Sequence, residues 1–184
     1  MRVAVCEYGA GNARSVVLAC ERLGADVSAT SDPEMVARAD LAVLPGVGSA
    51  RSAMQGLAAR GLDDALRDRV VAVGKPTLGI CLGLHLALES SAEDGGVRGL
   101  ALLPGRAVRL SRERVPRIGW APVDPGGEEL YFAHSYSAET PAATATSEGL
   151  VAVAESGSFV GVQFHPEKSG RAGARFLERR LSPA

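Results

Sequence analysis

The amino-acid sequence predicts an α/β fold, in which a doubly wound, mostly parallel β-sheet is flanked by helices and carries antiparallel additions in its C-terminal half. Three observations predict this class. Apolar strand-like runs alternate with helix-like segments over the first half of the chain, as in parallel sheets with helices on both faces. Glycine-rich turns follow three of these apolar runs. Short β-type runs between Gly, Pro and acidic turns fill much of the second half.

The first half contains apolar runs suited to buried strands, with helical segments between them. The first run, VAVCEY, precedes a segment with helical spacing that ends at Gly24, and Pro33 opens the next short helix. The expected strands are residues 3–8, 26–30, 40–45 and 76–80. The expected helices are residues 12–25, 33–39, 49–61 and 62–74, followed by a helix after Cys81.

The second half contains shorter β-type runs. These are GRAVRL, RIGWAPV, ELYFAHSYS, LVAVAES and FVGVQFH, at residues 105–110, 117–123, 129–137, 150–156 and 159–165. Their turns favour antiparallel pairing, so we expect them to extend the sheet. A closing helix is expected over residues 171–181. Because we find no internal repeat and no low-complexity linker, the sequence predicts one domain, residues 1–184.

The composition argues against several classes of protein. Twenty basic residues against 21 acidic ones give a formal net charge of −1, so electrostatics offers no reason to expect binding to nucleic acid or to an anionic membrane. The N-terminus shows neither a signal peptide nor a membrane span. Three cysteines do not make a secreted disulfide framework, and cysteines and histidines lack metal-ligand spacing. We therefore expect a cytoplasmic protein without a metal or other cofactor.

Three glycine-rich loops follow the first, third and fourth predicted strands. Their sequences are EYGAGN, PGVGS and GICLG. In open α/β sheets, ligands bind at the carboxyl ends of the parallel strands, and glycine lets the backbone approach a ligand closely. The sequence therefore predicts a binding site where these loops converge.

Cys81 lies at the centre of one of these loops, in the G-x-C-x-G pattern of residues 79–83. A nucleophile on a sharp strand-to-helix turn needs glycine on both sides, because a Cβ there would collide with the neighbouring strand or helix. The N-terminus of the following helix favours the thiolate and offers N–H groups to an oxyanion. A buried structural cysteine is the alternative, which the preceding strand and the following helix disfavour.

His165 is the candidate base for Cys81. It ends an apolar strand, and Pro166 favours extended backbone at His165, so that His165 and Glu167 would point to the same side. The carboxylate can then accept a hydrogen bond from one imidazole nitrogen while the other nitrogen faces the cysteine. Taken alone, QFHPEKS also fits a strand-terminal histidine beside a surface glutamate.

The turn LPGVGS carries two further signals. Backbone N–H groups around Val47 and Gly48 can supply an oxyanion donor. Ser49 in the same turn is a good N-cap for the helix that follows. The two roles are compatible.

The remaining histidine and cysteine signals are less specific. His85 lies four residues after Cys81 on the same helical face, where it can line the pocket or pack in the core. Cys6 and Cys20 have apolar neighbours, and we expect both in the core.

The motifs, taken together, resemble those of the class I, triad-type glutamine amidotransferases, which have a flavodoxin-like fold. They are YGAGNARSV, LPGVGS, GKPTLGICLG, GLALLPGRAVRL, PRIGW, YFAHSYS and GVQFHPEKSG, and they span nearly the whole chain in the family order. The loop around Cys81 and the HPE sequence identify the class. YGAGN, PGVGS, PRIGW and HPEKSG are most similar to the glutaminase subunit of imidazole glycerol phosphate synthase.

This resemblance implies a reaction. Cys81 would attack the side-chain amide of L-glutamine, and N–H groups of Leu82 and of the PGVG loop, at Val47 and Gly48, would hold the oxyanion. His165 would protonate the departing ammonia, and water would hydrolyse the glutamyl thioester. In the family the ammonia passes to a (β/α)8-barrel synthase subunit of a heterodimer, which makes imidazole glycerol phosphate for histidine biosynthesis.

The resemblance also implies binding residues. Those that fall where the family holds glutamine are Gly48, Glu93, Ser135 and Tyr136. His85 falls beside the bound glutamine. Those expected to meet the synthase subunit are Asn12, Trp120, Tyr131 and Lys168. From sequence alone, Trp120 and Tyr131 fit core aromatics as well as interface anchors.

Three departures from the family pattern keep other functions open. His85 stands where the family has Gln, Ala121 stands where it has Asn, and the segment between HSYS and FVGVQFHPE is short. One alternative is a paralogous amidotransferase subunit that supplies ammonia to a different synthase in a specialised pathway. Another is a cysteine hydrolase of the same fold class. A third, a non-catalytic subunit, is disfavoured by the intact Cys81, His165 and Glu167.

Overall fold

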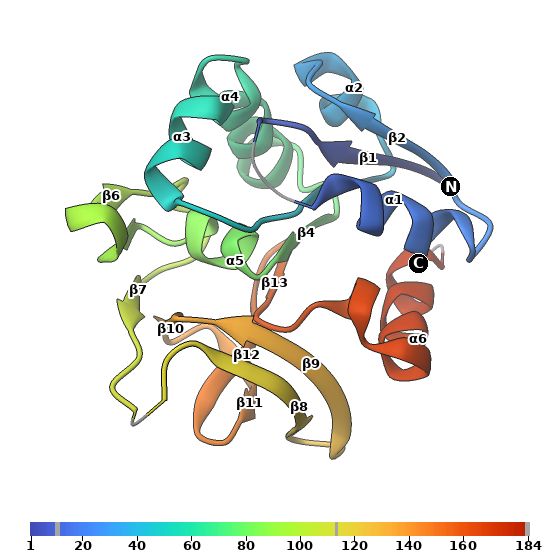
Figure 1. The fold of residues 1–184 in the computed structure, drawn as a ribbon. Coiled ribbons are helices and arrows are strands. Elements are labelled where there is room, and N and C mark those ends of the chain that lie inside the picture. The colour runs from blue at the N-terminus through green and yellow to red at the C-terminus, as the bar shows by residue number, and fades with distance from the viewer. Residues whose placement is uncertain (10–11, 113, 183–184) are drawn as a thin grey trace.

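A mostly parallel sheet organises the chain. The computed structural model describes residues 1–9, 12–112 and 114–182, and within them seven strands form this sheet in the order β11-β12-β13-β4-β3-β1-β2 (Figure 1). Its parallel strands are β2 (Asp26–Thr30), β1 (Arg2–Cys6), β3 (Leu41–Leu44), β4 (Thr77–Ile80) and β13 (Phe159–Val162). The antiparallel strands are β12 (Leu150–Ser156) and β11 (Ala143–Ser147). The predicted fold class is confirmed.

Helices cover both faces of this sheet. The helices on one face are α2 (Pro33–Arg38), α3 (Ala50–Ala58), α4 (Leu62–Arg67) with its π-helical continuation η1 (Asp68–Ala72), and α5 (Leu82–Ala87). Those on the other face are α1 (Ala13–Glu21) and α6 (Gly170–Leu181). Side chains of β1 alternate between the two layers: Ala4 and Cys6 pack against the first, whereas Val3 and Val5 pack against the second.

The second half differs in part from the expected antiparallel extension of the sheet. β13 pairs parallel to β4 and lies inside the parallel region. A separate small sheet consists of β10 (Tyr136–Glu139), β7 (Arg106–Arg109), β5 (Ser90–Ser91) and β6 (Val97–Arg98). An antiparallel hairpin consists of β8 (Arg117–Val123) and β9 (Glu128–His134). The run predicted at residues 129–137 is therefore divided at Ser135, because β9 pairs with β8 whereas β10 pairs with β7.

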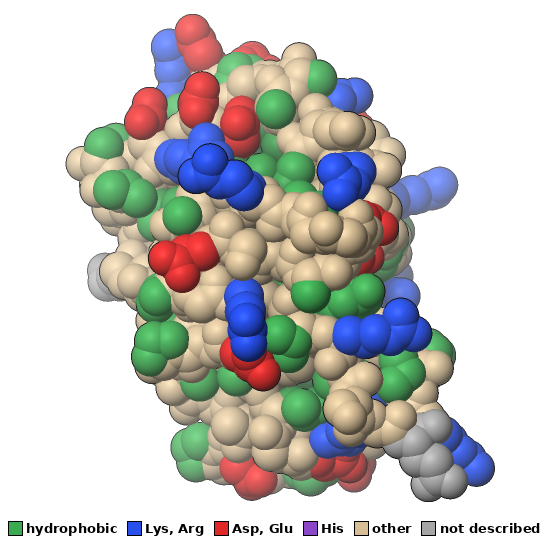
Figure 2. Space-filling view, turned by 90° about the vertical axis from the view of Figure 1, so that its left-hand side faces the viewer, with side chains coloured by type: hydrophobic (Ala, Val, Ile, Leu, Met, Phe, Trp, Pro, Cys, Tyr) green, Lys and Arg blue, Asp and Glu red, His purple; other side chains and the backbone are tan. Residues whose placement is uncertain are grey.

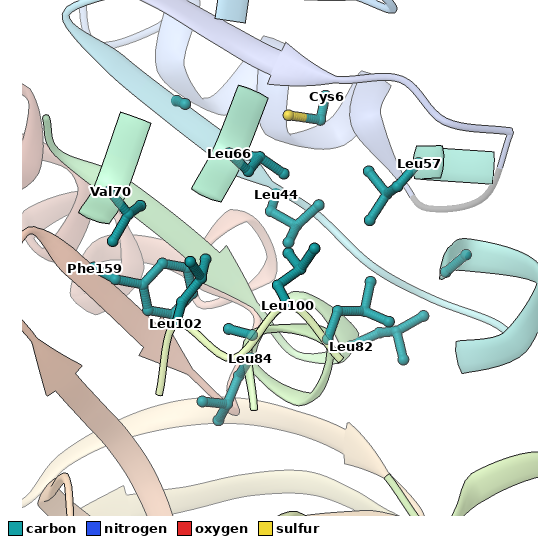
Figure 3. Packing of buried hydrophobic residues seen from close by; sticks show 14 of the residues in the cluster. Cys6, Leu44, Leu57, Leu66, Val70, Leu82, Leu84, Leu100, Leu102 and Phe159 are labelled. Carbon is teal, nitrogen blue, oxygen red and sulfur yellow. The ribbon is translucent and has the colours of Figure 1, made fainter. Parts of the chain in front are cut away.

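One core cluster lies between the sheet and helices α2 to α5 (Figure 3). Leu44 of β3, Leu57 of α3, Leu66 of α4 and Leu84 of α5 have no exposed surface. Fully burying such a side chain contributes about 1.5–3 kcal/mol relative to leaving it in water. This cluster fixes α5, whose first turn follows Cys81, against the strand that precedes it.

A second cluster packs the β8–β9 hairpin and α6 onto the opposite face. Phe164 lies at its centre: the ring meets Phe176 of α6 edge-on at 5.2 Å between centroids and Phe132 of β9 at 6.0 Å. Edge-to-face pairs of this kind add about 0.5–1.5 kcal/mol each beyond area burial. Because Phe164 directly precedes His165, this aromatic packing fixes the backbone that leads into the predicted site.

Charged side chains of both signs are interspersed over the face shown in Figure 2. Exposed ion pairs elsewhere in the described residues include Arg106 with Glu139 and Arg175 with Glu128. None of the helices in the described residues has the length and apolar character that crossing a membrane requires. The same residues contain no group of three His, Cys, Asp or Glu side chains arranged to hold a metal ion.

Arg69 of η1 is a buried cation that holds several chain segments together. Its side chain is almost inaccessible, with the residue only 1% exposed. Its guanidinium donates hydrogen bonds to Thr77 Oγ1 and to the carbonyl oxygens of Val36, Ala37, Ala39, Asp40 and Pro76. These acceptors belong to the end of α2, the entry to β3 and the entry to β4. Arg69 therefore fixes how two central strands begin.

We expect Arg69→Lys to lower the free energy of unfolding by about 2–4 kcal/mol. A lysine ammonium cannot reach the carbonyls at the end of α2, at the entry to β3 and at the entry to β4 at the same time. Urea unfolding followed by circular dichroism measures the loss. Arg38→Lys, in the exposed pair with Glu34, is the matched control and should cost less than about 0.5 kcal/mol. Equal losses in the two variants would contradict the role given to Arg69.

Candidate active site

Cys81 occupies a sharp turn between β4 and α5. It is buried, and its backbone has φ of 52° and ψ of −104°. A side chain at positive φ costs on the order of 1–3 kcal/mol and persists only where the surrounding packing requires it. The turn directs the thiol towards the rim at the carboxyl ends of the parallel strands, where the sequence predicts the site.

The two glycines that flank Cys81 are required by the packing around the turn. A Cβ on Gly79 would lie 2.7 Å from the ring of Phe159 and 2.8 Å from the carbonyl oxygen of Gly83. A Cβ on Gly83 would collide with the carbonyl oxygen of Leu44. The G-x-C-x-G pattern predicts that a Cβ at either glycine would collide with its surroundings. The structure confirms this, with a side chain and backbone at Gly79 and with backbone at Gly83.

His165 and Glu167 follow β13 and form a buried pair. His165 Nδ1 lies 2.9 Å from Glu167 Oε1, and both side chains are 2% exposed. His165 has extended backbone, as the following Pro166 predicts. The next three residues instead form the 3-10 turn η3 (Pro166–Lys168). Glu167 thus reaches the imidazole through a turn, and the expectation of strand alternation was wrong on this point.

The charge state of His165 depends on its two neighbours. Burial alone would lower the pKa of His165, but the hydrogen bonds and charges of Cys81 and Glu167 together outweigh burial and raise the pKa to about 9. Because Nδ1 faces the carboxylate, Nε2 is the nitrogen available to the cysteine. The three side chains have the arrangement of a nucleophile, a base and a carboxylate that orients the base.

The PGVG loop and the first turn of α5 lie against each other beside the thiol. The N–H of Leu82 opens α5, where backbone donors have no intrahelical acceptor. A Cβ on Gly46 would lie 2.5 Å from Leu82 Cβ, so the loop packs directly on this turn. Val47 and Gly48 line the cavity next to Cys81. Donors from both segments can therefore converge on an oxyanion.

Two side-chain contacts hold this loop. The Tyr8 hydroxyl donates to the carbonyl oxygen of Pro45. Ser49 caps α3, as predicted, and its hydroxyl donates to Asp94 Oδ2 at 2.6 Å. Asp94 thereby fixes the neighbouring Glu93 of η2 (Glu93–Gly95) beside the cavity. Residues 10–11 of the predicted loop EYGAGN lie outside the described residues.

A cavity of about 250 Å³ opens beside Cys81. Drug-sized ligands occupy pockets of about 300–1,000 Å³, so this cavity suits a smaller metabolite. The residues predicted to bind substrate all line it: Gly48, His85, Glu93, Ser135 and Tyr136. Three further lining residues were not predicted to bind substrate, although they lie within the PRIGW and YFAHSYS motifs: Pro116, Ala133 and His134.

The residues predicted to meet a partner lie outside the cavity lining; they are Asn12, Trp120, Tyr131 and Lys168. Trp120 of β8 is 54% exposed and meets the Tyr131 ring edge-on at 6.0 Å between centroids. The Tyr131 carbonyl accepts from the N–H of His165 at 2.8 Å, and the Tyr131 N–H donates to Ser169 Oγ at 2.9 Å. The half-buried Tyr131, which contacts the exposed Trp120, is therefore hydrogen-bonded to the segment that carries His165.

Gln163 is a site residue that was not predicted, although it lies within the GVQFHPEKSG motif. It is wholly buried, lies 2.8 Å from His85 through its Oε1, and donates through its Nε2 to Cys81 Sγ at 3.6 Å. A glutamine inside the apolar run FVGVQF is the signal that could have revealed it, because a buried polar side chain needs a partner.

The other two cysteines are core residues, and this expectation is confirmed. Burial is the main cause that raises the pKa of Cys6 to about 12 and that of Cys20 to about 11. Both are therefore thiols at neutral pH and poor nucleophiles. All three cysteines of the chain are free.

Comparison with known proteins agrees with the geometry. Residues 5–182 match the family model described as glutamine amidotransferase class-I. The chain is 42% identical to imidazole glycerol phosphate synthase subunit HisH of Carboxydothermus hydrogenoformans, over 95% of this chain and 96% of that one. It is 43% identical to the protein of the same name from Methanothermobacter thermautotrophicus, over 95% of both chains.

Solved structures extend the likeness to the fold. A crystal structure of glutamine amidotransferase aligns with a TM-score of 0.83 at 19% identity, over 97% of this chain and 96% of that one. A glutamine amidotransferase from Thermotoga maritima aligns with a TM-score of 0.63 at 21% identity, over 97% of this chain and 81% of that one. At these identities the likeness shows the fold alone.

The raised pKa of His165 predicts a titration that NMR can follow. The His165 ring should titrate near pH 9, and Glu167→Gln should lower that midpoint because the neutral amide removes a stabilising charge. The folded pKa lies above the unfolded value of 6.5, so the imidazolium contributes stability that is complete below pH 6.5 and is lost as the pH rises through about 9. An unchanged midpoint in Glu167→Gln would refute the pairing.

Proposed function

Because the chain belongs to the class I glutamine amidotransferase family, we propose that it is the glutaminase subunit of an imidazole glycerol phosphate synthase. It acts as a single domain, residues 1–184, in the cytoplasm, and it hydrolyses L-glutamine to glutamate and ammonia. The observation that carries this proposal is the buried pair of His165 and Glu167 next to Cys81, which itself lines a small cavity. The likeness to the HisH proteins supports the choice of imidazole glycerol phosphate synthase as the enzyme that uses the ammonia.

The chemistry follows from the three side chains. The Cys81 thiolate attacks the side-chain carbonyl carbon of glutamine, and the oxygen becomes an anion held by the N–H of Leu82 and the loop at Val47 and Gly48. The imidazolium of His165 gives its proton to the leaving nitrogen, so ammonia departs and a glutamyl thioester remains. Neutral His165 then accepts a proton from water, the water oxygen attacks the thioester, and glutamate and the thiolate are regenerated.

The cavity offers groups that fit the other end of glutamine. Glu93 borders it, and burial together with Asp94 raises the pKa of the Glu93 carboxyl. As a carboxylate it is the group suited to the α-ammonium of the substrate. Ser135 and Tyr136, at the turn from β9 to β10, and Gly48 border the same space and can direct backbone groups at the α-carboxylate.

The partner is proposed to be a (β/α)8-barrel synthase subunit, which forms a heterodimer with this chain and consumes the ammonia. The exposed face of β8 carries Ile118 and Trp120, both well exposed, and exposed aromatic residues of this kind are enriched at protein interfaces. The hydrogen bonds of Tyr131 connect this face to His165. An interface here would lie next to the site that releases ammonia.

The departure at Ala121 gives little support to a different synthase. Ala121 is buried and packs in the cluster beneath the hairpin, so its small side chain affects the core rather than the exposed face. His85 remains the departure inside the cavity. A cysteine hydrolase of the same fold is distinguished by labelling: a glutamine-mimicking electrophile should modify Cys81 if the chain is a glutaminase, and leave it unmodified otherwise.

Cys81→Ala should reduce glutamate release from glutamine by more than about 10³-fold, because the thioester cannot form. The assay combines the chain with the barrel synthase and with the ligand of that synthase. Cys6→Ala, which changes a thiol in the core, is the control and should retain the activity. Full glutaminase activity in Cys81→Ala would exclude the proposed mechanism.

Trp120→Ala should weaken binding to the barrel synthase by at least about tenfold, since exposed aromatic anchors carry much of the energy of an interface. Isothermal titration calorimetry measures the affinity. Val71→Ala is the control, because Val71 is also an exposed apolar residue, at 74%, but lies on η1. If both variants bind like the parent, the hairpin face is not the interface.

A further inference from the structure

His85 and Gln163 form a buried polar pair behind the nucleophile. His85 is 3% exposed and lies one helical turn after Cys81, whereas Gln163 follows β13 and is wholly buried. His85 Nε2 lies 2.8 Å from Gln163 Oε1, and Gln163 Nε2 donates to Cys81 Sγ at 3.6 Å. The three side chains thus form one hydrogen-bonded chain that ends at the sulfur.

The direction of this chain follows from its donors and acceptors. A carboxamide has one acceptor oxygen and one donor NH2 group. When the NH2 group of Gln163 faces the sulfur, its oxygen faces His85, and His85 Nε2 must carry a hydrogen and donate it. The reversed carboxamide would direct an oxygen at Cys81 and repel a thiolate. The orientation in the structure is the one that stabilises the thiolate.

His85 is suited to fix that orientation. Burial lowers its pKa, while the hydrogen bond to Gln163 opposes the effect. The ring is therefore neutral at neutral pH and carries one hydrogen, which the hydrogen bond to Gln163 assigns to Nε2. In active sites, the residue that donates a hydrogen bond to the reacting atom is commonly held in its orientation by a second residue.

The same two side chains would also satisfy each other as an ordinary polar pair in the core. The contact with Sγ separates the two interpretations, because a pair with only a structural role would leave the ionisation of Cys81 unchanged. His165 and Glu167 approach the cysteine from the η3 segment, so the Gln163 amide supplies a further, independent donor to the sulfur.

We propose that His85 and Gln163 are positioning residues for Cys81: His85 fixes the Gln163 carboxamide, whose N–H stabilises the thiolate and holds it for attack. This inference rests on the proposed function for the identity of the attacked amide. The stabilisation of the thiolate itself is measurable without glutamine.

The test is the pH dependence of Cys81 alkylation by iodoacetamide, followed by peptide mass spectrometry on the full chain. His85→Leu and Gln163→Leu should each raise the pH midpoint of the alkylation rate by about one unit, which is tenfold less thiolate below the midpoint. The double variant should show the same shift as either single variant, because one break already interrupts the chain. His85→Asn, which is too short to reach Gln163, repeats the test if the Leu variants do not fold.

Two variants complete the design. His85→Gln can still donate an N–H to Gln163 and should keep the parent midpoint. His134→Gln should also keep the parent midpoint. It changes another buried histidine of the cavity, one that is hydrogen-bonded to the Tyr136 carbonyl at 2.7 Å and not to Gln163. Near-ultraviolet circular dichroism verifies that each variant is folded.

Unchanged midpoints in the folded His85 and Gln163 variants, or shifts that add in the double variant, would overturn the inference. Failure of the proposed function looks different. In that case the parent chain with its barrel partner releases no glutamate, while the alkylation midpoints still shift in the variants.

Discussion

The close approach of backbone to backbone around Cys81 is the constraint on which the site depends. Gly83 packs against the carbonyl of Leu44 and Gly79 against the first turn of α5, so the helix begins much nearer to the sheet than side chains would allow. This proximity forces the reversal of the chain at Cys81. It also brings Gly46 of the neighbouring loop onto Leu82. Nucleophile and candidate oxyanion donors are therefore positioned by the same set of close backbone contacts.

The other half of the site is held by side chains. Phe164 fixes the chain just before His165, and Tyr131 fixes it through a backbone hydrogen bond at His165 itself. Arg69 acts instead on the Cys81 half of the site, at the entries to β3 and β4, the strands that lead to the PGVG loop and to Cys81. The site thus lies between two segments. Glycines, which lack side chains, position the turn at Cys81, and large aromatic side chains position the segment at His165.

Much of this arrangement was predictable from short motifs. The glycines around Cys81, the N-cap at Ser49 and the extended backbone at His165 depend on residues that are adjacent in sequence. The pairing of the later β-type runs was less predictable, because a strand of a few residues does not encode its neighbour. Gln163 also remained unidentified, since its partners His85 and Cys81 are about eighty positions away.

Strain at position 81 also has a bearing on how this protein can evolve. Positive φ is no burden for glycine, so the residue that would make this turn most stable is one that cannot perform the chemistry. Selection for thermal robustness alone would move the position away from cysteine, and only selection for turnover opposes it. Compensating substitutions are therefore to be sought in the two core clusters, where stability can be gained without changing the geometry of the turn at Cys81.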